Sequence, residues 1–157
     1  MKGIYSVLVE NRAGVLAEIA RLFARRNFNI ESLAVGETDR HDTSSMTIVS
    51  SGDQRTLDQI EKHLNKRIDV IKVRRLEERD ALSLEMMLIK VAYSVSTRSQ
   101  IMEICSIMGA SILHLSPRHM VIELHAAHEK IESFIDLVRP FGILEVQRTG
   151  TISMSRK

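Results

Sequence analysis

The chain has 157 residues, of which 44% are hydrophobic, and its formal net charge is +2. This length accommodates one ordinary domain or two small ones with a packed core, and so small a net charge argues against a nucleic-acid partner. The sequence has no signal-peptide pattern, no run of eighteen apolar residues and one cysteine, Cys105, so we expect a soluble cytoplasmic protein with no membrane contact.

The first half of the chain predicts the element order βαββαβ. Period-2 alternation or short apolar runs indicate strands over residues 4–9, 29–35, 45–49 and 70–73. A 3.6-residue period indicates two helices, whose expected core-facing residues are Leu16, Ile19, Ala20 and Phe23 in the first and Leu57, Ile60 and Leu64 in the second. The polar stretch 37–43 is expected to be the loop between the second and third strands.

The second half repeats this order. Strands are expected over residues 85–93, 112–115, 120–124 and 143–146. The core-facing helix residues are expected to be Ile101, Ile104, Cys105 and Met108 in the first helix and Ile131, Phe134, Ile135 and Val138 in the second. We therefore predict an α+β fold of two ferredoxin-like βαββαβ units in tandem. The expected domains are residues 1–76 and 84–157, with a linker at 77–83 in a strongly charged region.

The turn Asn11–Gly14 is the candidate functional motif of the first unit. It precedes a helix whose first backbone N–H groups have no intrahelical partner and lie at the positive end of the helix dipole, which favours the carboxylate of an amino acid. Gly14 lets a ligand approach the backbone closely. The Asn11 carboxamide oxygen can accept a hydrogen bond from the ammonium group of the amino acid, and the Asn29 amide is expected to supply a further polar contact. The alternative is that Asn11 and Gly14 are ordinary turn and cap residues.

Dimerisation is expected because units of this size leave strand edges or a sheet face uncovered. Pairing through the second strand would extend the sheet. It would also bring Asn29 and Ile30 of one chain against the turn of the other. The ligand would then lie between subunits.

No catalytic or metal-binding set emerges from the sequence. His125 and His128 form an H-x-x-H pair, but no cysteine or further histidine has matching spacing. Neither a G-x-S-x-G elbow nor a glycine-rich phosphate loop is present, so we expect a chain that is not an enzyme by itself. The turn 93–97 of the second half has neither the asparagine nor the glycine of the first, and Ser96 or Thr97 is expected to be a plain N-cap there.

The block Asn29-Ile30-Glu31-Ser32-Leu33 is the most specific of several segments with a familiar pattern. The others are Glu10, Asn11, Gly14 and Leu16, the strand 45–48, the helix and exit 59–70, and Glu85 with 87–91 in the second half. Together these segments resemble the regulatory (small) subunit of acetohydroxyacid synthase, also called acetolactate synthase, and in particular its ACT domain. The resemblance covers nearly the whole chain.

The resemblance implies a protein that binds a thiamine-diphosphate-dependent catalytic subunit, raises its activity and confers feedback inhibition by valine and sometimes isoleucine or leucine. At matching positions, the implied valine site comprises Asn11, Ala13, Gly14, Val15 and Leu16 of one subunit with Asn29 and Ile30 from the other. Thiamine diphosphate, Mg²⁺ and FAD are expected in the catalytic partner, and no cofactor in this chain.

Two other classes of function remain open at this point. A tandem ACT sensor that controls transcription is the first, although no helix-turn-helix is visible. A small enzyme of ferredoxin-like fold is the second, and it would need polar residues that converge on the sheet face. The sequence does not rank valine against isoleucine or leucine, because one methylene in an apolar pocket changes binding by only about 1–3 kcal/mol.

Overall fold

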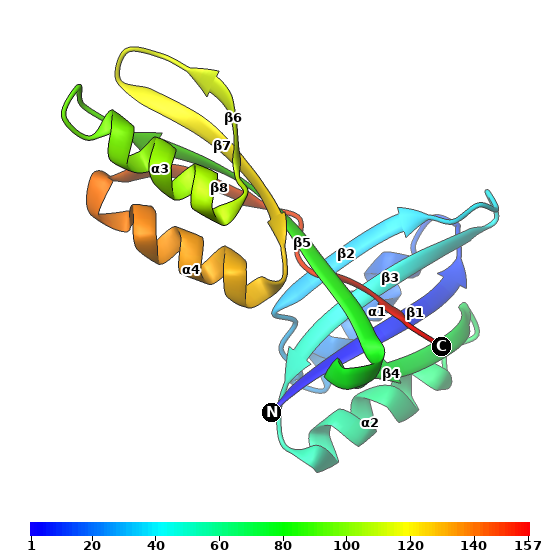
Figure 1. The fold of residues 1–157 in the computed structure, drawn as a ribbon. Helices are drawn as coiled ribbons and strands as arrows, with labels where there is room; N and C mark the ends of the chain where they lie inside the picture. Colours follow the sequence, from blue (N-terminus) through cyan, green and yellow to red (C-terminus); the bar gives the residue numbers. More distant parts are fainter. The chain divides into compact units, whose positions relative to one another are not determined.

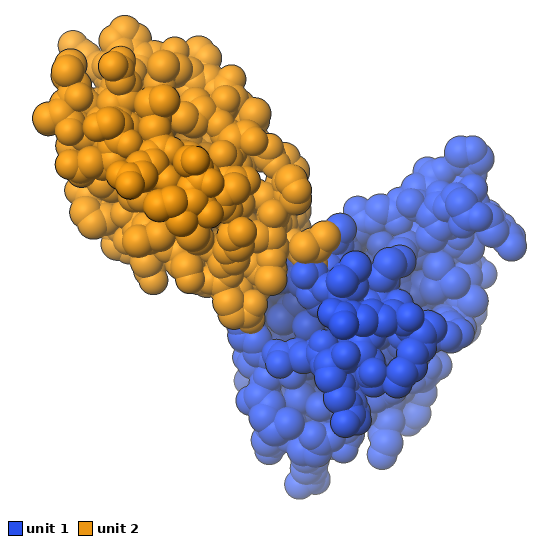
Figure 2. Space-filling model, viewed as in Figure 1, with its two compact units in different colours: residues 1–83, 151–157 blue, residues 84–150 orange.

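The computed structural model describes all 157 residues and divides into two compact units (Figure 2). Unit 1 comprises residues 1–83 and 151–157, and unit 2 comprises residues 84–150. Each unit has an antiparallel sheet with two helices packed on one face (Figure 1). The predicted α+β fold of two ferredoxin-like units is confirmed.

Unit 1 follows the order βαββαβ. Its elements are β1 (Lys2–Glu10), α1 (Val15–Arg25), β2 (Ser32–Glu37), β3 (Thr43–Ser51), α2 (Gln54–Asn65) and β4 (Val70–Leu76). The strand order β2-β3-β1-β4 leaves β2 and β4 at the two edges of the sheet. The core lies between sheet and helices and contains Tyr5, Val7, Val9, Met46 and Ile48 from the strands and Val15, Ile19, Phe23, Leu57, Ile60 and Leu64 from the helices.

The buried face of α1 differs from the expected one. Val15, Ile19 and Phe23 are buried, whereas Leu16 is 45% exposed and Ala20 is also exposed. The expectation that Leu16 and Ala20 face the core was therefore wrong. The helix carries two overlapping apolar stripes that share Ile19 and Phe23, and packing against the sheet buries Val15 rather than Leu16 beside them.

The second strand also begins later than expected. β2 starts at Ser32, so Asn29 and Ile30 lie in the connection that follows α1. The Asn29 carbonyl accepts a hydrogen bond from the Ser50 hydroxyl at 2.6 Å. This side-chain bond occupies the carbonyl, and regular strand pairing begins three residues later.

A two-stranded ribbon covers the face of the unit 1 sheet that the helices leave open (Figure 1). It consists of β9 (Ile152–Ser155) and the start of β5 (Ala81–Ala92), with the short 3₁₀ turn η1 (Glu78–Asp80) before it. The Thr151 N–H donates to Ser32 Oγ at 3.0 Å, and the Ser153 N–H donates to Thr47 Oγ1 at 3.2 Å. Residues 77–83 and 151–157 therefore pack with the first unit, whereas the sequence placed them in a linker and in the second domain.

Unit 2 repeats the arrangement of unit 1. Its elements are the remainder of β5, α3 (Arg98–Met108), β6 (Ser111–Leu115), β7 (His119–Ala126), α4 (His128–Val138), the 3₁₀ turn η2 (Arg139–Phe141) and β8 (Ile143–Arg148), with the strand order β6-β7-β5-β8. All four residues expected to face the core from α4 are buried. In α3, Ile101 and Cys105 are buried, and Ile104 and Met108 are partly so. None of the helices combines the length and hydrophobicity that crossing a bilayer requires.

A buried carboxylate joins three elements of unit 2. Glu85 of β5 faces the core, and its side chain is 2% exposed. The carboxylate accepts a hydrogen bond from Arg148 of β8 and lies 3.1 Å from Nδ1 of His128 in α4. Burial raises the pKa of Glu85, but the hydrogen bonds from Arg148 and His128 outweigh burial and hold the pKa below its ordinary value. Folding of this unit therefore favours the ionised carboxylate.

We expect Glu85→Gln to destabilise unit 2 by about 1.5–3 kcal/mol at pH 7, because the variant loses the buried carboxylate that accepts the charged hydrogen bond of Arg148, while Arg148 keeps Glu132 at 2.7 Å. A carboxyl group with a lowered pKa in the folded state adds stability above its unfolded pKa, near 4.3, and loses it as pH falls through the folded value. Thermal unfolding between pH 7 and pH 3 should therefore show a weaker acid dependence in Glu85→Gln than in the parent. Glu103→Gln, on the exposed surface of α3, is the control and should keep the parent's dependence, because no ion pair holds the Glu103 carboxylate. Identical pH profiles for Glu85→Gln and the parent would contradict this account.

Candidate functional site

The turn Asn11–Gly14 joins β1 to α1, and hydrogen bonds hold the asparagine in place. The Asn11 N–H donates to the Asp42 carbonyl at 2.8 Å, and Asn11 Nδ2 donates to the His41 carbonyl at 2.8 Å. The side-chain nitrogen is thus occupied, while Oδ1 makes no hydrogen bond within the chain. The carboxamide oxygen is the free acceptor of the turn.

Gly14 is the N-cap residue of α1, with φ 89° and ψ −14°. This left-handed conformation is unfavourable for residues with a Cβ, which explains the glycine. A Cβ at Gly14 would meet no atom within 4 Å, so the space beside the turn is open. The N–H groups of Leu16 and Ala17 make no hydrogen bond within the chain, and no side chain caps the helix. Together these donors and the helix dipole form an environment that favours an anion.

Two ion pairs connect this region with the α2–β4 loop, residues 66–69. Arg12 of the turn pairs with Asp69, and Glu18 in the first turn of α1 lies 2.6 Å from Arg67. The sequence alone gives no sign of these two pairs. The partners are separated by 57 and 49 residues, so no local pattern signals them.

The predicted site residues next to the turn differ in accessibility. Asn11, Ala13 and Gly14 are exposed, and Leu16 is half-exposed on the first turn of α1. The Val15 side chain is 4% exposed and packs in the core. Val15 therefore cannot offer its side chain to a ligand.

Asn29 lies far from the turn within one chain. Asn11 is hydrogen-bonded to Asp42, directly before β3, whereas Asn29 is hydrogen-bonded to Ser50, near the end of β3. At 3.2–3.4 Å per strand residue, these two points are roughly 25 Å apart. One small ligand cannot contact both asparagines of the same chain, and the same holds for Ile30, the neighbour of Asn29.

The corresponding turn of unit 2 is closed by its own side chains. The Ser94 N–H donates to Thr97 Oγ1 at 2.9 Å, and the hydroxyls of Ser94 and Ser96 lie 2.9 Å apart. Thr97 occupies the N-cap position of α3 but makes no capping bond. The polar groups of this turn are thus bonded to one another.

Two further polar features lie outside the Asn11–Gly14 turn: a pair of histidines and a groove. His125 and His128 lie beside separate carboxylates, Glu123 at 2.9 Å and Glu85 at 3.1 Å. No group of three or more His, Cys, Asp or Glu side chains is arranged to hold a metal ion.

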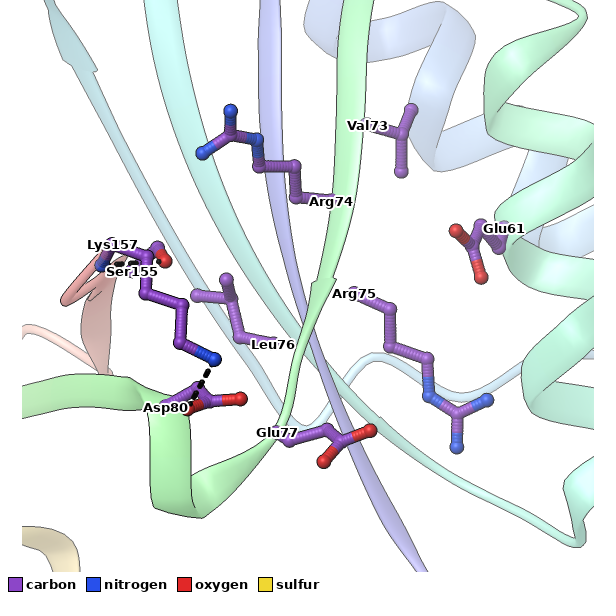
Figure 3. Close-up of a pocket in the computed structure, with 9 residues that line it drawn as sticks. All are labelled: Glu61, Val73, Arg74, Arg75, Leu76, Glu77, Asp80, Ser155 and Lys157. Carbon is purple, nitrogen blue, oxygen red and sulfur yellow. Dashed lines mark hydrogen bonds and ion pairs between the residues drawn. The ribbon is translucent and has the colours of Figure 1, made fainter.

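The second feature is a groove of about 590 Å³ along the Leu76 end of β4 (Figure 3). Its cationic side chains include Arg75, which lies 3.0 Å from Asp58, and Lys157, which lies 3.0 Å from Asp80. The charges of Arg75 and Lys157 are therefore compensated within the chain, whereas Arg74, which also lines the groove, makes no ion pair. The Asn11–Gly14 turn lies at the other end of β4, near Val70.

The fold and the turn define a class of protein: a tandem of ferredoxin-like units whose first member is an ACT domain. Residues 5–72 match the family model of the ACT domain of acetohydroxyacid synthase small-subunit-like proteins. Residues 84–157 match the family model of the small subunit of acetolactate synthase. The chain belongs to the acetolactate synthase small subunit family, and this family implies a catalytic large subunit as partner.

Individual relatives agree over nearly the full length. The chain is 47% identical over 154 residues to a probable acetolactate synthase small subunit from Methanothermobacter thermautotrophicus, covering 98% of this chain and 92% of the relative. It is 44% identical over 151 residues to the acetolactate synthase small subunit of Mycobacterium bovis, covering 96% and 90%. The crystal structure of the acetolactate synthase small subunit from Thermotoga maritima matches with a TM-score of 0.92 and 35% identity, covering 100% of this chain and 98% of that one. The resemblance seen in the sequence is confirmed.

Proposed function

We propose that this chain activates the thiamine-diphosphate-dependent catalytic subunit of acetolactate synthase and makes it sensitive to feedback inhibition by valine. Membership of the small subunit family supports the partnership. The observation that carries the effector assignment is the Asn11–Gly14 turn, which combines a free acceptor with free N–H donors at a helix N-terminus. These are the groups that an α-amino acid requires.

In the proposed complex, the ligand carboxylate accepts hydrogen bonds from the N–H groups of Leu16 and Ala17. The ligand ammonium donates to Asn11 Oδ1. The apolar side chain lies near Leu16, whose exposure in the isolated chain is then explained by its role in the site. Ile30 supplies the opposite wall from the second subunit.

The second subunit enters through the free edge of β2. Ser32 pairs with Val49 and Glu37 pairs with Ser44, so the two ends of β2 lie near opposite ends of β3. In a two-fold antiparallel pairing of two β2 strands, the Ser32 end of one chain meets the Glu37 end of the other. Asn29, three residues before Ser32, is then brought toward the Asn11 turn of the second chain. This arrangement resolves the separation of the two asparagines within one chain.

Regulation follows from a population shift. Valine binds preferentially to a dimer conformation that holds the catalytic partner in a less active state. In this proposal the chain contributes no catalytic group and no cofactor, and thiamine diphosphate, Mg²⁺ and FAD remain with the catalytic subunit. The buried single cysteine fits a cytoplasmic complex. The relatives' names favour this function over a sensor that controls transcription.

We expect the purified chain to sediment as a homodimer, to bind valine in calorimetry and to show no pyruvate condensation alone. Reconstitution with the catalytic subunit should raise its rate, and valine should then lower it. Parallel titrations with isoleucine and leucine should rank the three amino acids by affinity. A stable monomer at micromolar concentration, turnover by the lone chain, or no binding of any of the three amino acids with the catalytic subunit present would overturn the proposal.

A further inference from the structure

A negative side chain lies at the end of α1 where the effector carboxylate is proposed to bind. Glu18 is the fourth residue of the helix, and an uncompensated carboxylate there would compete for the positive end of the helix dipole. Its charge is compensated, because Glu18 Oε2 lies 2.6 Å from Arg67 and Oε1 lies 2.7 Å from Arg21. Arg21 belongs to α1 itself, whereas Arg67 reaches it from the α2–β4 loop.

The same loop also holds the other end of the turn. Asp69 pairs with Arg12, and the Asp69 carbonyl accepts a hydrogen bond from the Glu10 N–H at 3.0 Å. The Arg12 carbonyl in turn accepts from the Val15 N–H at 3.4 Å, at the start of α1. A short loop thus contacts the turn before Gly14 through Asp69 and the helix after Gly14 through Arg67.

We propose that Arg67 and Asp69 are positioning residues of the effector site. Arg67, together with Arg21, neutralises Glu18 and keeps the helix N-terminus available to the ligand carboxylate. Asp69, together with Glu10, holds Arg12 and with it the conformation of the turn. Neither side chain needs to contact the ligand. The inference rests on the proposed function and adds to it residues outside the Asn-x-x-Gly motif.

A purely structural role makes a different prediction. The Arg67 and Glu18 side chains are 33% and 36% exposed, and ion pairs this accessible contribute little to folding stability. A structural pair would therefore leave valine affinity unchanged. An electrostatic role in the site predicts an affinity loss that disappears when the Glu18 charge is also removed.

The test is calorimetric titration of valine into the holoenzyme. Arg67→Gln should raise the Kd about threefold, because Arg21 still pairs with the other Glu18 oxygen and partly exposed charge interactions are weak. The double variant Glu18→Gln/Arg67→Gln should return to within about twofold of the parent, because the Glu18 carboxylate itself is then removed. The loss in Arg67→Gln should shrink at high salt. Asp69→Asn should also weaken binding, without rescue by Glu18→Gln.

Arg75→Gln is the matched control, because it breaks an ion pair of the same unit, with Asp58 at 3.0 Å, at the other end of β4. It should bind valine like the parent. If the parent binds valine and Arg67→Gln binds it equally well, or if the double variant stays as weak as the single one, the positioning role is wrong while the proposed function stands. If the parent holoenzyme itself binds no valine, the proposed function fails and the inference fails with it.

Discussion

Gly14→Asp should abolish inhibition by valine while the holoenzyme keeps most of its activation. The new carboxylate would lie at the N-terminus of α1, where the ligand carboxylate is proposed to bind. Two like charges about 5 Å apart repel by about 3 kcal/mol at an effective dielectric constant of about 20. This corresponds to a loss of affinity of about a hundredfold. Inhibition curves of the reconstituted enzyme measure it directly.

The variant Gly14→Asn distinguishes the effect of the new charge on valine inhibition from the effect of backbone strain. Gly14 has a positive φ, and asparagine tolerates this conformation better than most residues while matching aspartate in shape. The Cβ that both side chains add at Gly14 would meet no atom within 4 Å, so the two variants differ mainly in charge. We expect Gly14→Asn to keep measurable inhibition at a higher valine concentration. Inhibition of Gly14→Asp at the parent's valine concentration would disprove binding of the carboxylate at this helix terminus.

Asn29→Ala should weaken valine binding about ten- to a hundredfold, because a hydrogen bond to a charged ligand group contributes roughly 1.5–3 kcal/mol. Dimers that carry a different substitution on each chain show which of the two sites loses its valine affinity. In dimers with Asn11→Ala on one chain and Asn29→Ala on the other, both changes fall in the same one of the two shared sites. Calorimetry on dimers purified through two different tags should find one site per dimer with the parent's affinity.

The matched control places both substitutions on one chain and none on the other. Each shared site then lacks one asparagine, and no site with the parent's affinity should remain. If the two asparagines acted within a single chain, the first dimer would keep no site with the parent's affinity. The control dimer would then keep one such site. The roughly 25 Å between Asn11 and Asn29 along β3 is the reason to expect the shared arrangement.

The repeat of βαββαβ units could be predicted from the sequence because its signals are local. Leu57, Ile60 and Leu64 mark α2 by their spacing alone, and all three are buried. The same holds for the four buried residues of α4. One error arose where two local patterns compete. In α1, the stripe with Leu16 and the stripe with Val15 are both helical, and only packing against the sheet selects between them.

The sequence by itself determined the two-unit fold, the family and the Asn-x-x-Gly turn, since each is written in residues that lie close together in the chain. The tertiary structure decided which residues surround that turn. Strand register sets Asn29 at the far end of β3 from Asn11, and chain folding brings Arg67 and Asp69 to the turn and the tail 151–157 to the open face of the first sheet. Pairing between distant segments depends on the burial of the whole sheet. The hydrophobic period within one segment does not show which distant segment lies beside it.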